Sequence, residues 1–248
     1  FHNNYQIKSY FGRANAIVLR PIFIKYSLLL IGALSIIISV VYGNEQTLYI
    51  KPVFHIVLFL WYFSVKKKID VKLVFFLGFA LTAEFLTAID FDGYYTLINI
   101  LFACYFFVGL WCMKPVLQQS KFTLRGQEVF FGLLITGVLL YMVYGLIYYS
   151  IQEFQENVPT VLGGISFLLF TGGCFYVTLF HSHPKKFYLF VVGSCYFVVC
   201  LGYMVYQLLL LSDLLMGLVN TAEIIAQFYF VLFMIHKQEM LSKTKWYI

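Results

Sequence analysis

Eight long apolar segments dominate the sequence and limit the folds that the chain can adopt. They cover residues 26–43, 49–65, 73–89, 94–113, 129–150, 159–180, 187–207 and 217–235. Each is close to the roughly 20 residues that a helix needs to cross a bilayer. Hydrophobic residues make up 62% of the chain and charged residues 11%, whereas soluble domains carry about 25% charged residues. Because a water-soluble core cannot bury this excess, we expect an all-α integral membrane protein with eight transmembrane helices.

The connections between these segments alternate between basic and acidic. Of the seventeen lysines and arginines, sixteen fall in the N-terminal region, in alternate connections and in the C-terminal tail. The remaining connections carry acids, namely Asp90 with Asp92, Glu153 with Glu156, and Asp213 between the last two segments. The positive-inside rule assigns basic connections to the cytoplasm. The pattern therefore predicts that both termini are cytoplasmic, and seven spans would place the basic tail outside.

The chain divides into three parts on this basis. Residues 1–25 are predicted to be a basic cytoplasmic arm at the membrane interface or an ordinary positive flank, without a signal peptide. Residues 26–236 are the transmembrane domain, and residues 237–248 are a cytoplasmic tail. The Phe-, Tyr-, Ile- and Lys-rich composition is typical of an AT-rich bacterial genome. We therefore expect a multi-pass protein of a bacterial inner membrane.

Several classes of partner and cofactor are not indicated by the sequence. The net charge of +6 does not predict nucleic-acid binding, because the basic residues lie between apolar segments and not on one face. All five cysteines lie inside apolar segments, where we interpret them as small packing residues and not as disulfides or metal ligands. Neither a metal nor a cofactor is expected.

Polar side chains inside the apolar segments are the candidates for function. Glu84 lies within the third segment, where a central acid costs roughly 2.5 to 3.5 kcal/mol. The predicted orientation places Glu84 in the outer half of the membrane, at a depth similar to that of Lys51, His55, Glu223 and Gln227. Because isolated charges in lipid are expensive, we expect these groups to meet in the bundle interior. Such a cluster could fix helix register, bind a lipid or small molecule, or handle protons or ions.

Four segments carry short motifs similar to those of one membrane-protein family. The second segment begins LYIKPVFHIVLFLWYFSVKKK, with a Lys-Pro start, an apolar run and a basic loop. In the third, Ala83-Glu84 stands where that family has Gly-Asp. Matched positions in the seventh and eighth segments are Gly193, Phe197, Ala226 and Gln227. Over the second to fourth segments and the seventh and eighth, about half its length, the chain thus resembles the YhhN family of eight-span membrane proteins, which includes lysoplasmalogenases.

Departures from the family pattern bear on what the resemblance implies. The acid of the third segment is kept only as the longer Glu84, and the Ser-Asp of the seventh aligns with Cys200-Leu201. The histidine of the fourth segment is missing. The resemblance therefore implies a catalytically degenerate protein, acting as a lipid-binding or complex-forming membrane subunit. Its partners would be membrane lipids and other membrane protein subunits.

An active enzyme is the alternative that the resemblance leaves open. Lysoplasmalogenases cleave the vinyl ether of lysolipids, giving a fatty aldehyde and a glycerophospho-alcohol. This reaction needs a group that protonates the alkenyl carbon and a base that activates water. The candidate catalytic residues are Glu84, suited to the acid role, with Glu223 or His55, and the candidate substrate-binding residues are Lys51, Gln227 and Tyr105. A small-solute or proton transporter is a second alternative.

Overall fold

The computed structural model of the chain describes residues 21–42, 50–121, 126–154, 157–208 and 213–242. These residues are almost wholly helical, and no strand occurs among them, which confirms the all-α class. The helices are α1 (Pro21–Tyr42), α2 (Lys51–Lys66), α3 (Val71–Asp90), α4 (Tyr95–Gln119), α5 (Gly126–Phe154), α6 (Asn157–Phe180), α7 (Phe187–Leu208) and α8 (Asp213–Leu241). A short 3-10 turn, η2 (Pro184–Lys186), precedes α7. Residues 1–20 of the predicted arm at 1–25 and residues 243–248 of the predicted tail at 237–248 lie outside the described residues.

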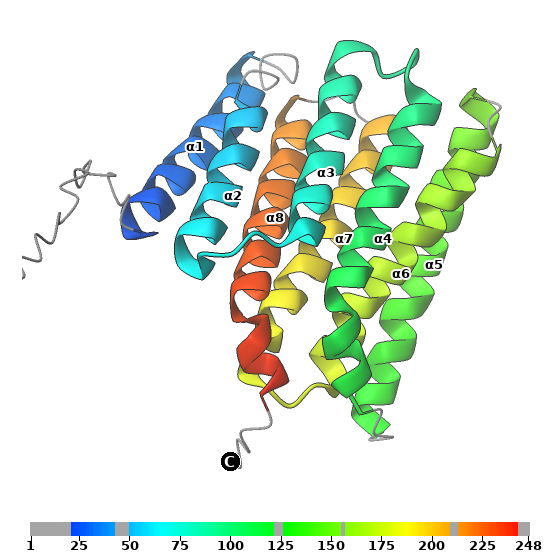
Figure 1. The fold of residues 1–248 in the computed structure, drawn as a ribbon. Helices are drawn as coiled ribbons and strands as arrows, with labels where there is room; N and C mark the ends of the chain where they lie inside the picture. The colour runs from blue at the N-terminus through cyan, green and yellow to red at the C-terminus, as the bar shows by residue number, and fades with distance from the viewer. Residues whose placement is uncertain (1–20, 43–49, 122–125, 155–156, 209–212, 243–248) are drawn as a thin grey trace, which may run out of the picture.

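The helices stand side by side and run alternately up and down (Figure 1). Helix α8 is central, because it packs against α1, α2, α4 and α7. Helices α1 and α5 lie at opposite edges of the bundle (Figure 1). The start of α1 and the end of α8 lie at the same end, which is the lower end in Figure 1. The turn between α3 and α4 is at the opposite, upper end.

By length and composition, five helices in the described part of the chain can cross a membrane. They are Pro21–Val41, Tyr95–Gln119, Val158–Phe180, Pro184–Tyr203 and Leu214–Leu241. A shorter apolar stretch, Val129–Gly145, lies within α5. Helix α2 has 16 residues and is about 24 Å long at the usual rise per residue, which is less than a typical hydrocarbon core. Large apolar side chains are exposed on all eight helices, so the bundle has an apolar perimeter compatible with a multi-pass membrane protein.

The ends of α2 and α3 are fixed by local backbone chemistry. Lys51 is the first residue of α2, and the proline that follows it is compatible with the first helical turn. Lys67 ends α2 in the left-handed region, with φ 55°, and its N–H donates to the Phe63 carbonyl. The Asp70 side chain accepts a hydrogen bond from the Lys72 N–H at 3.0 Å and caps α3. Helix α2 begins at the upper end of the bundle (Figure 1). Its first residue, Lys51, contacts Glu84 of α3 and Glu223 of α8.

An aromatic cluster joins four helices in the middle of the bundle. The Phe76 ring of α3 lies 4.1 Å, between ring centroids, from both Tyr105 of α4 and Phe230 of α8. Phe170 of α6 packs against the same three rings. Gly109 of α4 allows this approach, since a Cβ there would lie 2.5 Å from a Phe170 ring carbon. This packing holds α3, α4, α6 and α8 together on the lower side of the polar groups described next.

Candidate functional site

Five polar side chains meet between α2, α3 and α8. Lys51 and His55 lie one turn apart on α2, Glu84 comes from α3, and Glu223 and Gln227 lie one turn apart on α8. We call these five residues the polar cluster. The sequence predicted that they share one depth, and the structure brings all five into contact. Four of the five are more than nine-tenths buried, and the Lys51 side chain is 13% exposed.

One ammonium group contacts two carboxyl groups in the polar cluster. The Lys51 Nζ donates a hydrogen bond to Glu223 Oε2 at 3.2 Å and lies 3.5 Å from Glu84 Oε2. Because both oxygens contact the same ammonium, the two carboxyl groups are neighbours. Two adjacent carboxylates around one cation leave an excess negative charge inside an apolar bundle. A single proton, held on one of the two carboxyl groups, would make the cluster neutral with an uncharged His55.

The orientation of the His55 ring follows from its own helix. His55 Nδ1 lies 2.8 Å from the Lys51 carbonyl oxygen, and because a carbonyl only accepts, Nδ1 carries the hydrogen. The other nitrogen, Nε2, faces Glu84 Oε1 at 3.6 Å, which is too long for a hydrogen bond. Gln227 Nε2 donates to that same Glu84 Oε1 at 2.9 Å. His55 Nε2 and Glu84 Oε2 are both buried and have no hydrogen-bond partner.

Tyr105 lies in the aromatic cluster and not among the five polar residues. Its hydroxyl is hydrogen-bonded to the hydroxyl of Tyr196 on α7, and both side chains are buried. Sequence reasoning missed Tyr196. The available signal was its position inside an apolar segment, away from the segment ends where membrane tyrosines usually lie.

Helix α1 contributes a second polar contact that the sequence did not indicate. Asn220 Nδ2 donates to Ser39 Oγ at 2.6 Å, and both side chains are about 99% buried. Asn220 precedes Glu223 by three residues and Gln227 by seven, so the three share one face of α8. This spacing was visible in the sequence and extends the polar stripe of α8 toward α1.

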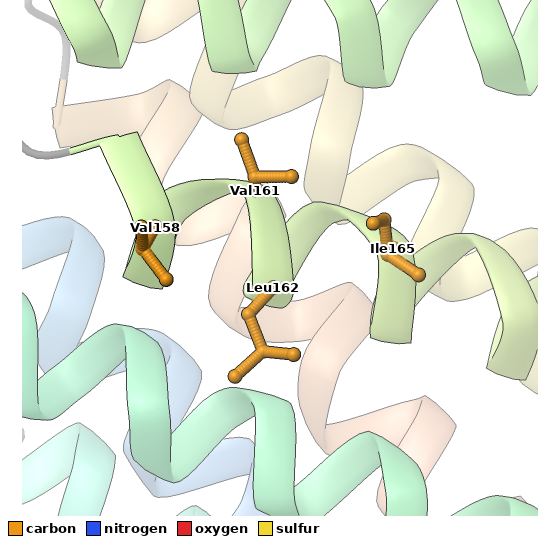
Figure 2. Close-up of a pocket in the computed structure, with 4 residues that line it drawn as sticks. All are labelled: Val158, Val161, Leu162 and Ile165. Carbon is orange, nitrogen blue, oxygen red and sulfur yellow. The ribbon is translucent and has the colours of Figure 1, made fainter.

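Other features of the structure lie apart from the polar cluster. An apolar pocket of about 310 Å³ is lined by Val158, Val161, Leu162 and Ile165, all on α6 (Figure 2). It carries no member of the polar cluster. Within the described residues, no group of three or more His, Cys, Asp or Glu side chains is arranged to hold a metal. All five cysteines are free thiols, and three of them are buried.

Comparison with protein-family models, with curated proteins and with solved structures gives no match to this chain. The interpretation of the polar cluster therefore rests on the chemistry of its own residues. That chemistry combines paired carboxyl groups, an ammonium group and an imidazole, all within reach of one another. Such a set can hold a proton, release it and take it back.

Proposed function

We propose that this chain is an eight-span membrane protein of a bacterial inner membrane, with both termini cytoplasmic, that hydrolyses the vinyl ether of a lysolipid. The observation that carries the proposal is the meeting of Glu84, Glu223, Lys51 and His55 at hydrogen-bond or ion-pair distance. The eight alternating helices and the charge pattern support the eight spans. The short motifs similar to the YhhN family support the substrate class.

The reaction assigns one carboxyl group as acid and the other as base. Glu84 lies against Gln227, Lys51 and His55, and these neighbours suit a carboxylate that accepts a proton. Both acids contact Lys51, but Glu84 also has Gln227 and His55 beside it, so the charged form of Glu223 is stabilised by fewer neighbours. We therefore assign Glu223 as the proton donor and Glu84 as the base, the reverse of the role that the sequence suggested for Glu84.

The two carboxyl groups then act in sequence. The Glu223 proton is transferred to the vinyl carbon that does not bear oxygen, leaving an oxocarbenium ion. Water adds to the carbon that bears oxygen, and Glu84 takes a proton from that water. The resulting hemiacetal breaks its bond to the glycerol oxygen, which takes the proton held by Glu84, while the hemiacetal hydroxyl gives its proton to Glu223 and restores both acids. The products are a fatty aldehyde and a glycerophospho-alcohol, for the net uptake of one water.

A lipid-binding or complex-forming subunit without catalysis is the second candidate. It is favoured by the burial of the two acids, since Glu84 is 7% and Glu223 8% exposed, and each already has a protein partner. The replacement of the family's second acid by Cys200-Leu201 points the same way. In this case the polar cluster would fix the register of α2, α3 and α8.

An aldehyde-release assay separates the two candidates. Purified protein in lipid nanodiscs is given a lysoplasmalogen, and the variants Glu84→Gln and Glu223→Gln are compared with Asp92→Asn. Asp92 is a matched control, because it is an exposed acid in the turn between α3 and α4 and is not part of the polar cluster. We expect each cluster variant to lose about 100-fold or more in rate and the control to lose nothing.

Two outcomes would count against hydrolysis at this site. Turnover at the wild-type rate in both cluster variants would exclude the polar cluster as the catalytic site. Binding of a saturated ether lysolipid by wild-type protein that releases no aldehyde would favour the non-catalytic subunit.

A further inference from the structure

Two buried polar atoms in the polar cluster have unused hydrogen-bonding capacity. His55 Nε2 and Glu84 Oε2 come from different helices, and neither has a hydrogen-bond partner. The Lys51 carbonyl fixes the hydrogen of His55 on Nδ1, so Nε2 offers a lone pair. The Lys51 ammonium, 3.5 Å from Glu84 Oε2, is a donor beside that oxygen. Burial of such groups without a hydrogen-bond partner is unfavourable.

We propose that His55 and Glu84 bind an O–H group, supplied either by water or by a hydroxyl of the lipid. An O–H group donates one hydrogen bond and accepts others, so it can donate to His55 Nε2 or Glu84 Oε2 while accepting from Lys51. The site thus favours a small group with an O–H bond, placed next to the two acids. This inference rests on the proposed function for the identity of the lipid, but the binding of an O–H group does not require catalysis.

The test compares two lipids that the protein cannot cleave. Both are saturated ether lysolipids, one with a free hydroxyl at the second glycerol carbon and the other with a methoxy group there. Their dissociation constants are measured on wild-type protein, on His55→Phe and on His55→Gln. Phenylalanine removes the acceptor, whereas glutamine reaches the position of Nε2 with a polar group. Aldehyde release from a lysoplasmalogen is measured on the same three proteins.

If the lipid supplies the O–H group, the wild type binds the hydroxyl lipid at least tenfold more tightly than the methoxy lipid. His55→Phe then loses that difference and His55→Gln keeps part of it. If water supplies it, the wild type binds both lipids equally, and His55→Phe slows aldehyde release without changing either dissociation constant. A His55→Phe variant that folds and matches the wild type in both measurements overturns the proposal. Because the lipids in the binding arm are inert, absence of hydrolysis alone leaves that arm intact.

A different observation concerns the turn between α6 and α7, at the lower end of the bundle. His181 Nδ1 accepts a hydrogen bond from the His183 N–H at 3.2 Å. His183 Nδ1 in turn accepts from the Lys185 N–H at 3.1 Å and caps η2. Both histidines are about 95% buried. In each ring, the lone pair of Nδ1 therefore accepts a hydrogen bond from the backbone N–H two residues later in the chain.

The charged groups around this turn are mostly basic. His181 lies near His183 and Lys186, and His183 lies near Lys185 and the α8 residues His236 and Glu239. Lys185 also joins the turn to α8, because its ammonium is hydrogen-bonded to Glu239 and lies 2.7 Å from His236 Nδ1. An opening of the turn would therefore be transmitted to the end of the central helix.

We infer that this turn is a pH-sensitive switch. Its two hydrogen bonds form while His181 and His183 are neutral and break when the rings are protonated. Protonation places a hydrogen on Nδ1 and converts each acceptor into a donor that faces a backbone N–H. Both turn hydrogen bonds are then lost. Release would free the start of α7 and the Lys185 contact with α8.

The direction of the pH effect follows from the surroundings of the two rings. Burial, together with the neighbouring positive groups, lowers the pKa of both His181 and His183, and Glu239 opposes this only for His183. A lowered pKa in the folded protein means that the unfolded chain binds protons first. The stability from the neutral rings is complete above the usual histidine pKa of about 6.5 and declines as the pH falls through the lowered values.

Asparagine provides a non-titrating replacement, since its Oδ1 occupies the position of histidine Nδ1. Hydrogen exchange of the His183 and Lys185 amides is measured in nanodiscs at about pH 7.5 and pH 5.5, corrected for the intrinsic rate. We expect wild-type protection to fall at least tenfold at the lower pH, and the protection of His181→Asn/His183→Asn to stay constant. Equal wild-type protection at both pH values, or a fall that persists in the asparagine variant, overturns the inference. Nitrogen-15 NMR of wild-type histidines checks the same point without a variant, because the inference requires Nδ1 to be unprotonated at pH 7.5.

Discussion

Replacement of Lys51 by methionine is the change to which the polar cluster should respond most strongly. Lys51 Nζ is 3.2 Å from Glu223 Oε2 and 3.5 Å from Glu84 Oε2, so its removal leaves two neighbouring acids without their shared cation. Loss of one partner from a buried ion pair costs about 3 to 5 kcal/mol. The Lys51 side chain keeps 13% exposure, and one acid can take up a proton. We therefore expect the lower end of that range, so that Lys51→Met reduces the free energy of unfolding by about 3 kcal/mol.

The assay is thermal unfolding of the purified protein in detergent. A loss of about 3 kcal/mol corresponds to a fall in Tm of roughly 6 to 12 °C for a chain of this size. Lys51→Met/Glu223→Gln should recover part of the loss, because it removes one of the two like charges. Lys114→Met is the matched control: Lys114 is exposed on α4, and its replacement should change stability by less than about 0.5 kcal/mol. The reasoning is refuted if Lys51→Met unfolds at the wild-type temperature, or if the double variant is no more stable than the single one.

Two further substitutions test the contacts of the aromatic cluster. Gly109→Ala should cost about 1 to 3 kcal/mol, because its Cβ would lie 2.5 Å from a Phe170 ring carbon. Gly78→Ala, with nothing within 4 Å of its Cβ, should be neutral or stabilising in the same unfolding assay, and equal effects at the two glycines would contradict the close approach of α4 and α6. Tyr196→Phe should cost about 1 to 3 kcal/mol by leaving the buried Tyr105 hydroxyl unpaired. Tyr105→Phe/Tyr196→Phe should cost less than the sum of the two single variants, and strict additivity would argue against the hydrogen bond.

The sequence by itself determined the helices and the residues of the polar cluster. The predicted segment 159–180 corresponds to α6 (Asn157–Phe180), and 73–89 corresponds to α3 (Val71–Asp90). The length of an apolar segment depends only on the local sequence, and a connection with charged residues ends each segment, so the helices could be predicted. The contact between Glu84 and Lys51 could be predicted from the sequence, because a charge in an apolar bundle needs a partner at the same depth.

Only the tertiary structure decided how the helices are rotated and which side chains touch. It formed the hydrogen bonds between Tyr105 and Tyr196 and between Asn220 and Ser39. It also oriented His55 Nε2 toward Glu84. An apolar helix has similar hydrophobicity on all faces, so its sequence does not specify which face meets a neighbour. That choice depends on the fit of rings such as Phe76 into spaces made by other helices, which no single segment contains.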